Sequence, residues 1–169
     1  MKVLILDGVH FDEQVVVAVG VDVRGNKHVL GLWEGASEHS TTCKALLNEL
    51  VERGLRTDAS ILVVLDGSKA LSRAVRAVFG KRALIQRCQE HKKRNVLDAL
   101  PPSQRASVKR ALNTAFQGAD AERAKRLLEN LARSLSEPHP GAAASLREGL
   151  DEMLTLKRLG LGGSALERT

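Results

Sequence analysis

Two aspartates occur in the same short phrase at two distant points of the sequence. Asp7 lies in Leu-Asp-Gly at residues 6–8, and Asp66 lies in Leu-Asp-Gly at residues 65–67. Each follows a short apolar run typical of a buried strand. Two carboxylates that face one site repel each other unless a cation lies between them, and hard oxygen ligands suit Mg²⁺ or Mn²⁺. Either aspartate alone would indicate only a turn, but the pair predicts a metal site.

A second group of chemically versatile residues follows further along the chain. Cys88 and His91 form a Cys-x2-His step, and both side chains are good zinc ligands. A structural zinc site needs four ligands. The remaining candidates, His39 and Cys43, belong to a distant segment that nothing in the sequence brings near. We therefore expect a buried cysteine and a hydrogen-bonded histidine, without structural zinc.

Basic residues come directly after this step, at Lys92, Lys93 and Arg94. They suit contacts with phosphate groups, although an exposed basic turn of a helix would look the same. Charge is unevenly spread along the chain: residues 1–60 carry a net −3 and residues 81–134 a net +8, within a total of +6 and a pI near 9.7. An acidic first third beside a basic second half fits a metal site flanked by a phosphate-binding surface.

The period of the apolar residues predicts the elements that must position these side chains. Strands are expected at residues 3–6, 14–23, 27–33, 60–65 and 82–86, with the second and third joined as an antiparallel hairpin by a turn at 24–26. Helices are expected at residues 40–54, 68–79 and from 89 onward, with joints at 101–102, 118 and 138–141 and with Ser103 as a helix cap. If the first and fourth strands are adjacent and parallel, Asp7 and Asp66 meet at their carboxyl ends.

This order of elements predicts an α/β fold with a mixed five-stranded sheet covered by helices on both faces, followed by an all-helical region. It matches the order of the ribonuclease H-like fold, in which acids at the ends of central strands hold catalytic metal. The match is a fold-level analogy and does not fix a function. We place the catalytic core in residues 1–100 and the helical region in residues 101–169.

Five stretches together resemble one protein family. They are residues 6–11 (LDGVHF), 29–37 (VLGLWEGAS), 64–70 (VLDGSKA), 86–97 (QRCQEHKKRNVL) and 143–150 (AASLREGL). In this order they resemble the Mutator-like family of bacterial insertion-sequence transposases. The resemblance runs from Lys2 to Thr169, and the Cys-x2-His step after the second aspartate is its most specific part.

The resemblance implies a ribonuclease H-like catalytic domain with an Asp-Asp-Glu triad and a helical insertion before the glutamate. Asp7 would be the first acid and Asp66 the second, and Cys88 and His91 would be the hallmark pair. It also implies two Mg²⁺ or Mn²⁺ ions, DNA as the partner and a homo-oligomer in the complete enzyme. Such an enzyme would hydrolyse a phosphodiester at the end of the element, and the freed 3′-hydroxyl would then attack a phosphodiester of target DNA.

The third acid is where the sequence departs from the family. There the glutamate lies in a Thr-Asn-x-Ile-Glu phrase just after a segment like residues 160–169, and this phrase does not occur in the sequence. Glu148, Asp151, Glu152 and Glu167 lie outside the motif. We therefore expect a catalytic-domain fragment that binds DNA weakly, without sequence preference and without metal-dependent cleavage.

Two alternatives remain open from the sequence. One is a non-catalytic DNA-binding or oligomerisation remnant of a decayed element, which would need the basic surface and no metal. The other is a ribonuclease H-like nuclease that completes its site with Glu34 or Asp98. Because no secretory signal or membrane-length apolar run is present and cysteines are few, we expect a soluble, cytoplasmic protein.

Overall fold

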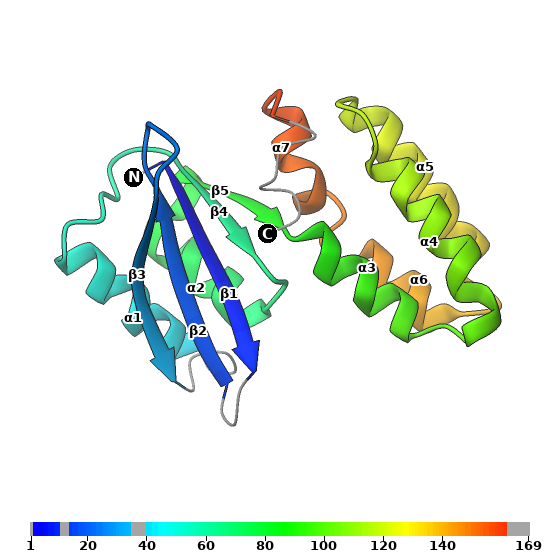
Figure 1. Cartoon of the computed structure of the whole chain (residues 1–169), viewed down its shortest axis with the longest axis horizontal. Helices are drawn as coiled ribbons and strands as arrows, with labels where there is room; N and C mark the ends of the chain where they lie inside the picture. The colour runs from blue at the N-terminus through cyan, green and yellow to red at the C-terminus, as the bar shows by residue number, and fades with distance from the viewer. Residues whose placement is uncertain (1, 11–13, 35–39, 162–169) are drawn as a thin grey trace. The chain divides into compact units, whose positions relative to one another are not determined.

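The chain forms two compact units in the computed structural model, which describes residues 2–10, 14–34 and 40–161. The first unit is Met1–Ile85 and the second is Gln86–Thr169 (Figure 1). This division lies earlier than the boundary that we placed after residue 100. The reason is that Val96 and Leu100 are buried in the apolar cluster of the helical unit.

The first unit is built on a mixed sheet with strand order β3-β2-β1-β4-β5, which confirms the predicted five-stranded α/β architecture. The strands are β1 (Val3–His10), β2 (Gln14–Val21), β3 (Lys27–Glu34), β4 (Ile61–Leu65) and β5 (Ala83–Arg87). As predicted, β2 and β3 pair antiparallel. Strand β1 lies in the middle, antiparallel to β2 and parallel to β4.

Strand β1 is longer than its apolar run predicts. It was expected to end at Leu6 but continues to His10, because β2 pairs with it along its whole length. Pairing with β4 covers only the first half and ends at the partners Leu6 and Leu65. Asp7 therefore lies inside β1, just beyond the last residue paired with β4, and not at the end of its strand.

One face of the sheet is covered by helices α1 (Ser40–Glu52) and α2 (Lys69–Phe79), which lie side by side (Figure 1). Apolar residues of both helices and of β1, β2 and β4 form a single buried cluster, in which Leu47, Val63 and Val75 are fully buried. The apolar faces that the helical period of 3.6 and the strand period of 2 predict are therefore packed together in one core. Coverage of the second face stays a prediction.

The turn between β2 and β3 is organised by Asp22. Its carboxylate accepts hydrogen bonds from the backbone N–H of Arg24 at 2.8 Å and of Asn26 at 3.0 Å. The hydrogen bond with His28, followed by those with Asn26, holds the pKa of Asp22 far below its usual range. Aspartates commonly close turns by accepting hydrogen bonds from nearby backbone N–H groups. Asp22 has this structural role, and we therefore do not count it among the candidate site residues.

The second unit is helical apart from the end of β5. Its helices are α3 (Gln89–Asp98), α4 (Pro102–Phe116), α5 (Ala121–Ser134), α6 (Pro140–Arg147) and α7 (Thr155–Arg158), with a short 3-10 turn η2 (Glu152–Leu154) before the last. Apolar residues of α3 to α6 and of η2 share one buried cluster. Helix α4 is capped by Pro101 and starts at Pro102, so Ser103 lies in its first turn and is not the cap that we predicted. None of the described helices is long and apolar enough to cross a membrane.

Candidate functional site

The two aspartates of the Leu-Asp-Gly phrases lie on adjacent strands. Leu6 and Leu65 are paired across the parallel β1 and β4, so Asp7 on β1 and Asp66 directly after β4 occupy the next position along each chain segment. The prediction of adjacent parallel strands is confirmed. Asp7 is half-buried, with its Oδ1 atom shielded from solvent, and Asp66 is half-buried directly after β4. Both carboxylates therefore lie at the boundary between the sheet core and the surface.

Gly8, the residue after Asp7, lies directly against Asp66. A Cβ atom added at Gly8 would lie 2.9 Å from Oδ2 of Asp66, which is closer than real Cβ contacts. The glycine thus leaves room for the second carboxylate beside the strand that carries the first. This is a close approach that a side chain would prevent.

The second glycine serves a different purpose. Gly67 has a φ of +115°, a conformation that L side chains rarely adopt. It turns the chain from β4 into α2, so that Oδ1 of Asp66 accepts a hydrogen bond from the backbone N–H of Ser68 at 2.8 Å. Ser68 in turn caps α2 by accepting from the N–H of Leu71 at 3.3 Å. Asp66 is thereby held in one orientation at the start of a helix, where negative charge is favourable.

The thiol of Cys43, on α1, is affected by the charge of Asp66. It is fully buried, and burial raises the pKa of the thiol, with a smaller upward contribution from the charge of Asp66. The thiol therefore stays protonated at neutral pH. Cys43 is part of the sheet core, and it forms no disulfide with Cys88.

Further ligands do not gather around the two aspartates in the part of the chain that the structure describes. Among those residues, no three His, Cys, Asp or Glu side chains are placed to hold one metal ion. Glu34 is at the end of β3, opposite Val15 of β2, and β2 separates it from β1. Two strand spacings amount to about 10 Å, and among the described residues Glu34 forms no metal-holding group with Asp7 and Asp66. His39 and Glu167 lie outside the described residues.

The stretch that holds the Cys-x2-His step is tied to the end of the helical unit. The buried Gln86 side chain donates to the carbonyl of Met153 at 2.9 Å and accepts from the N–H of Leu156 at 2.9 Å. Gln89 also donates to Met153, at 3.2 Å. Cys88 is buried at the start of α3, and His91 is half-buried with its Nδ1 shielded from solvent. Neighbours of the hallmark pair therefore anchor η2 and α7, while the absence of zinc there stays a prediction.

Lys92 does not have the exposure that a phosphate contact requires. Only 4% of the residue is exposed, and its Nζ donates to the carbonyl of Ser145 at 2.7 Å and lies 3.7 Å from the carboxylate of Glu148. Burial, together with the charge of nearby Arg87, lowers the pKa of Lys92 to about 8. Arg87 is also buried and donates to the carbonyl of Glu148 at 3.0 Å. These cations hold the helical unit together.

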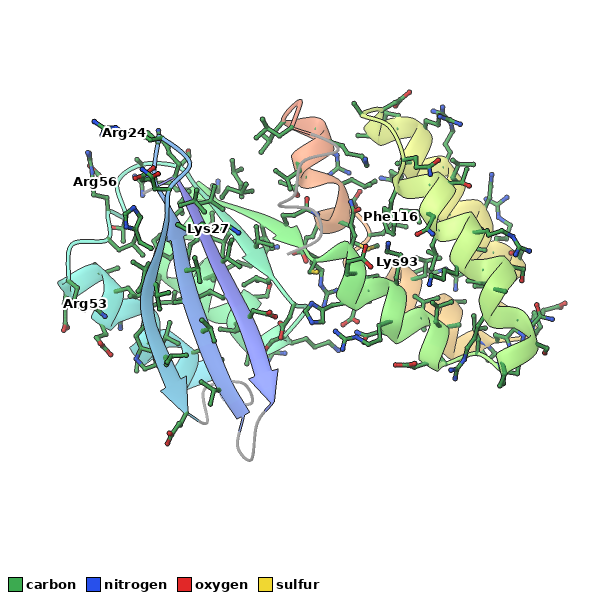
Figure 2. The ribbon with its side chains drawn as sticks, viewed as in Figure 1. Arg24, Lys27, Arg53, Arg56, Lys93 and Phe116 are labelled. Atoms are coloured by element: carbon green, nitrogen blue, oxygen red, sulfur yellow. The ribbon has the colours of Figure 1, made fainter. Side chains whose placement is uncertain are left out.

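Lys93 and Arg94 are better placed for contacts with a partner. Lys93 lies on the side of α3 that faces α4 (Figure 2), with 16% of its side chain exposed, where it pairs with Glu90 and donates to Asn113 at 3.2 Å. Arg94 is exposed. Our sequence reasoning missed Arg105 and Lys109, which lie on α4 beside these residues and line the same groove. Their four-residue spacing, in a helix without an acidic residue, is the signal that could have found them.

Known proteins resemble this chain over most of its length. A family model described as "Transposase, Mutator family" matches residues 2–161. The chain is 30% identical over 156 residues to the transposase of insertion sequence IS6120 from Mycolicibacterium smegmatis, covering 88% of the chain and 47% of that protein. It is 31% identical over 153 residues to the transposase of IS406 from Burkholderia multivorans, covering 89% of the chain and 38% of that protein.

A third relative, the transposase of IST2 from Acidithiobacillus ferrooxidans, is 29% identical over 140 residues, which cover 83% of the chain and 47% of that protein. The chain thus spans less than half the length of the curated relatives that it matches. The family model, in contrast, covers nearly the whole chain, including Asp7, Asp66 and the Cys-x2-His step. The chain belongs to the Mutator family of transposases.

Proposed function

We propose that this chain supplies two of the metal-binding carboxylates, Asp7 and Asp66, of a transposase that cuts and joins DNA. The observation that carries the proposal is the packing of the Asp66 carboxylate against Gly8, the residue after Asp7. Two distant acids would have no reason to meet beside a glycine if each only closed a turn. Membership in a transposase family supports DNA as the substrate.

The sheet supports a ribonuclease H-like catalytic core for this enzyme. Its order β3-β2-β1-β4-β5, with a hairpin on one side of β1 and a parallel crossover on the other, is the arrangement expected of that fold. Asp7 and Asp66 lie just beyond Leu6 and Leu65, the last residues that pair β1 with β4. In open α/β sheets, ligands bind at this edge.

The two carboxylates fit Mg²⁺ or Mn²⁺ better than zinc. Mg²⁺ is commonly held by one or two carboxylates together with waters and substrate phosphates, and two oxygen-bearing side chains are what Asp7 and Asp66 offer. Bound metal would activate the attacking hydroxyl and stabilise the leaving oxygen. The chain's own contribution is to hold both carboxylates in place, through strand pairing for Asp7 and through the Ser68 hydrogen bond for Asp66.

Metal titration with matched variants tests the proposal. Binding of Mn²⁺ to the 169-residue chain would be followed by calorimetry for the wild type, Asp7→Asn, Asp66→Asn and Asp58→Asn. Asp58 is an exposed carboxylate of the same unit that pairs with Arg56 at 2.6 Å, so it controls for loss of one negative charge. We expect binding to be lost in both site variants and kept in the Asp58 variant. Equal binding by all four proteins would refute the proposal.

A nuclease assay on DNA carrying element ends completes the test. We expect no strand cleavage by this chain in Mg²⁺ or Mn²⁺, because Asp7 and Asp66 are not joined by a third carboxylate within the described residues and two-metal chemistry needs further ligands. Cleavage that disappears in both site variants would contradict this expectation and indicate a third metal ligand. DNA binding without any metal binding would favour a non-catalytic remnant. Assembly into a homo-oligomer stays a prediction.

A further inference from the structure

The helical unit contains a groove between α3 and α4 whose walls are basic. It has a volume of about 680 Å³. Lys93 and Arg94 line it from α3, Arg105 and Lys109 line it from α4, and Leu97 and Ala106 contribute apolar surface between them. All of these residues belong to the second unit, so the groove is complete within that unit. We call it the α3–α4 groove.

Helical periodicity explains why these side chains share one groove. Lys93 and Leu97 are four residues apart on α3, and Arg105 and Lys109 are four residues apart on α4. Side chains at this spacing lie one above the other on the same helix face, about 5–6 Å apart at their Cβ atoms. The α4 wall therefore presents Arg105 and Lys109 in a row along the groove, whereas the two cations of the α3 wall, Lys93 and Arg94, are consecutive residues.

The balance of charge in the groove favours an anionic occupant. Four cations face two carboxylates, Glu90 and Asp98, both from α3. Glu90 pairs with Lys93, which partly neutralises that lysine. The α4 wall has no acidic residue, since none occurs between Pro102 and Phe116. The charge available to a partner is therefore concentrated in Arg94, Arg105 and Lys109.

Few of the hydrogen-bond donors of Arg94, Arg105 and Lys109 are used within the helical unit. Arg105 donates its Nε to the carbonyl of Leu100 at 3.0 Å, which uses one of the five N–H donors of a guanidinium group. Arg94 and Lys109 are exposed. This contrasts with Lys92, on the same helix as Arg94, whose ammonium group is buried against Ser145. The groove cations thus keep donors directed at solvent.

We infer that the α3–α4 groove binds the sugar–phosphate backbone of duplex DNA, with phosphates on Arg94, Arg105 and Lys109 and a deoxyribose against the apolar floor. The inference rests on the proposed function for DNA as the polyanion. Backbone contacts of this kind position a protein on a duplex without reading its sequence. Binding in the groove is therefore independent of sequence and strongly dependent on salt.

The test compares two pairs of substitutions that remove the same charge from different surfaces of the helical unit. The groove pair is Arg94→Gln with Lys109→Gln, and the control pair is Arg123→Gln with Arg126→Gln on α5, both exposed and outside the groove. Fluorescence anisotropy with a labelled 20-base-pair duplex of arbitrary sequence would measure affinity between about 50 and 200 mM salt, the range over which phosphate contacts are lost. Circular dichroism verifies that each protein is folded.

We expect the groove pair to make the log–log salt slope shallower by about 2, close to 1 per lost phosphate contact, and the control pair to leave it unchanged. Glu90→Gln should tighten binding, because it frees Lys93 from its ion pair. Equal slopes for the groove pair and the wild type would overturn the inference while leaving DNA binding, and so the proposed function, intact. A wild-type chain that binds no duplex would refute the DNA half of the proposed function itself.

A second probe separates DNA from an acidic protein partner. Polyglutamate of similar charge would be titrated against the same proteins. Affinity for duplex that depends on Arg94 and Lys109, with weak polyglutamate binding, supports the inference. Polyglutamate binding that depends on these residues while duplex binding does not would overturn it in favour of an acidic polypeptide.

Discussion

The two units of the chain use charged residues in opposite ways. All five buried polar or charged residues among those the structure describes belong to the second unit: Gln86, Arg87, Gln89, Lys92 and Lys157. In the first unit the sheet core is apolar, and its notable carboxylates, Asp7 and Asp66, are half-buried where the pairing of β1 with β4 ends. Charge thus marks a candidate site in one unit and serves as internal scaffolding in the other.

This difference shows why a count of basic residues overstates a nucleic-acid surface. Arg87, Lys92 and Lys157 contribute to the positive total of the second half, yet each is buried and donates to backbone carbonyls. A buried cation must be fully hydrogen-bonded to be tolerated. Only exposed cations, such as those of the α3–α4 groove, remain for a polyanion.

The largest expected effect comes from removing an internal cation of the second unit. Lys157 donates to the carbonyl of Phe116, at the end of α4 (Figure 2), at 2.9 Å and also to that of Gly118. Lys157→Met leaves both carbonyls without this donor in a buried position, which we expect to cost about 3 kcal/mol. Urea unfolding, with hydrogen exchange resolved by unit, would measure the loss and locate it in the second unit.

Lys109→Met is the matched control, because Lys109 is an exposed lysine on α4. Its effect on stability should stay within about 0.5 kcal/mol. If both substitutions changed stability equally, Lys157 would not be scaffolding and the contrast between the units would fail.

The next effect is a dependence of stability on pH that originates in Lys92. Its pKa is lowered to about 8, mainly by burial and next by the charge of Arg87, against attraction from Glu148 and Glu152. Between pH 8 and the ordinary lysine value near 10.5, the unfolded chain therefore binds more protons than the folded chain. Stability attributable to Lys92 must then rise with pH across this window, by at most about 3 kcal/mol.

Urea unfolding at pH 7.5, 9 and 10.5 would test this sign. The difference in unfolding free energy between wild type and Lys92→Met should shift in favour of the wild type as pH rises. A difference that is constant across the window would mean that Lys92 is not titrating in the folded chain.

A smaller but more local effect is expected in the first unit at Gly8. Gly8→Ala places a methyl group 2.9 Å from Oδ2 of Asp66, so the carboxylate must move. We expect Mn²⁺ affinity to fall about tenfold, equivalent to about 1.4 kcal/mol, while the core remains folded. Calorimetric titration beside thermal unfolding would separate the two quantities. Unchanged Mn²⁺ affinity would show that the position of Asp66 is not critical to metal binding.

Much of the first unit could be predicted from local sequence because its signals are local. The β-branched run before Asp22 predicts a strand, and the apolar run before Asp66 predicts a fully buried one, which β4 is. The hairpin between β2 and β3 follows from its turn residues. Length was harder: β1 extends past Asp7 because β2 pairs with it, and such pairing is a long-range property that no local run encodes.

The second unit shows what local sequence does not reveal. Lys92, Lys93 and Arg94 are consecutive and chemically alike, yet Lys92 is buried and Arg94 is exposed. Their fates differ because successive residues on a helix point about 100° apart, and only the packing of α3 against α6 decides which direction is inside. The carbonyl of Ser145 that Lys92 reaches is distant in sequence. Periodicity could indicate the faces, but not their partners.

The smallest effect concerns another glycine, which serves as a control for the substitution of Gly8. Gly141 lies in the first turn of α6, and a Cβ atom added there would meet nothing within 4 Å. Its φ is not in the left-handed region. Gly141→Ala should therefore stabilise the second unit by about 0.5 kcal/mol, because alanine loses less backbone entropy than glycine in a helix. Metal affinity should be unchanged.

Thermal unfolding and Mn²⁺ titration of Gly8→Ala and Gly141→Ala, side by side, would reveal whether a methyl group in place of glycine matters by itself or only where it meets Asp66. Destabilisation by Gly141→Ala, or the same loss of Mn²⁺ affinity in both variants, would show that the effect of Gly8→Ala does not depend on its contact with Asp66.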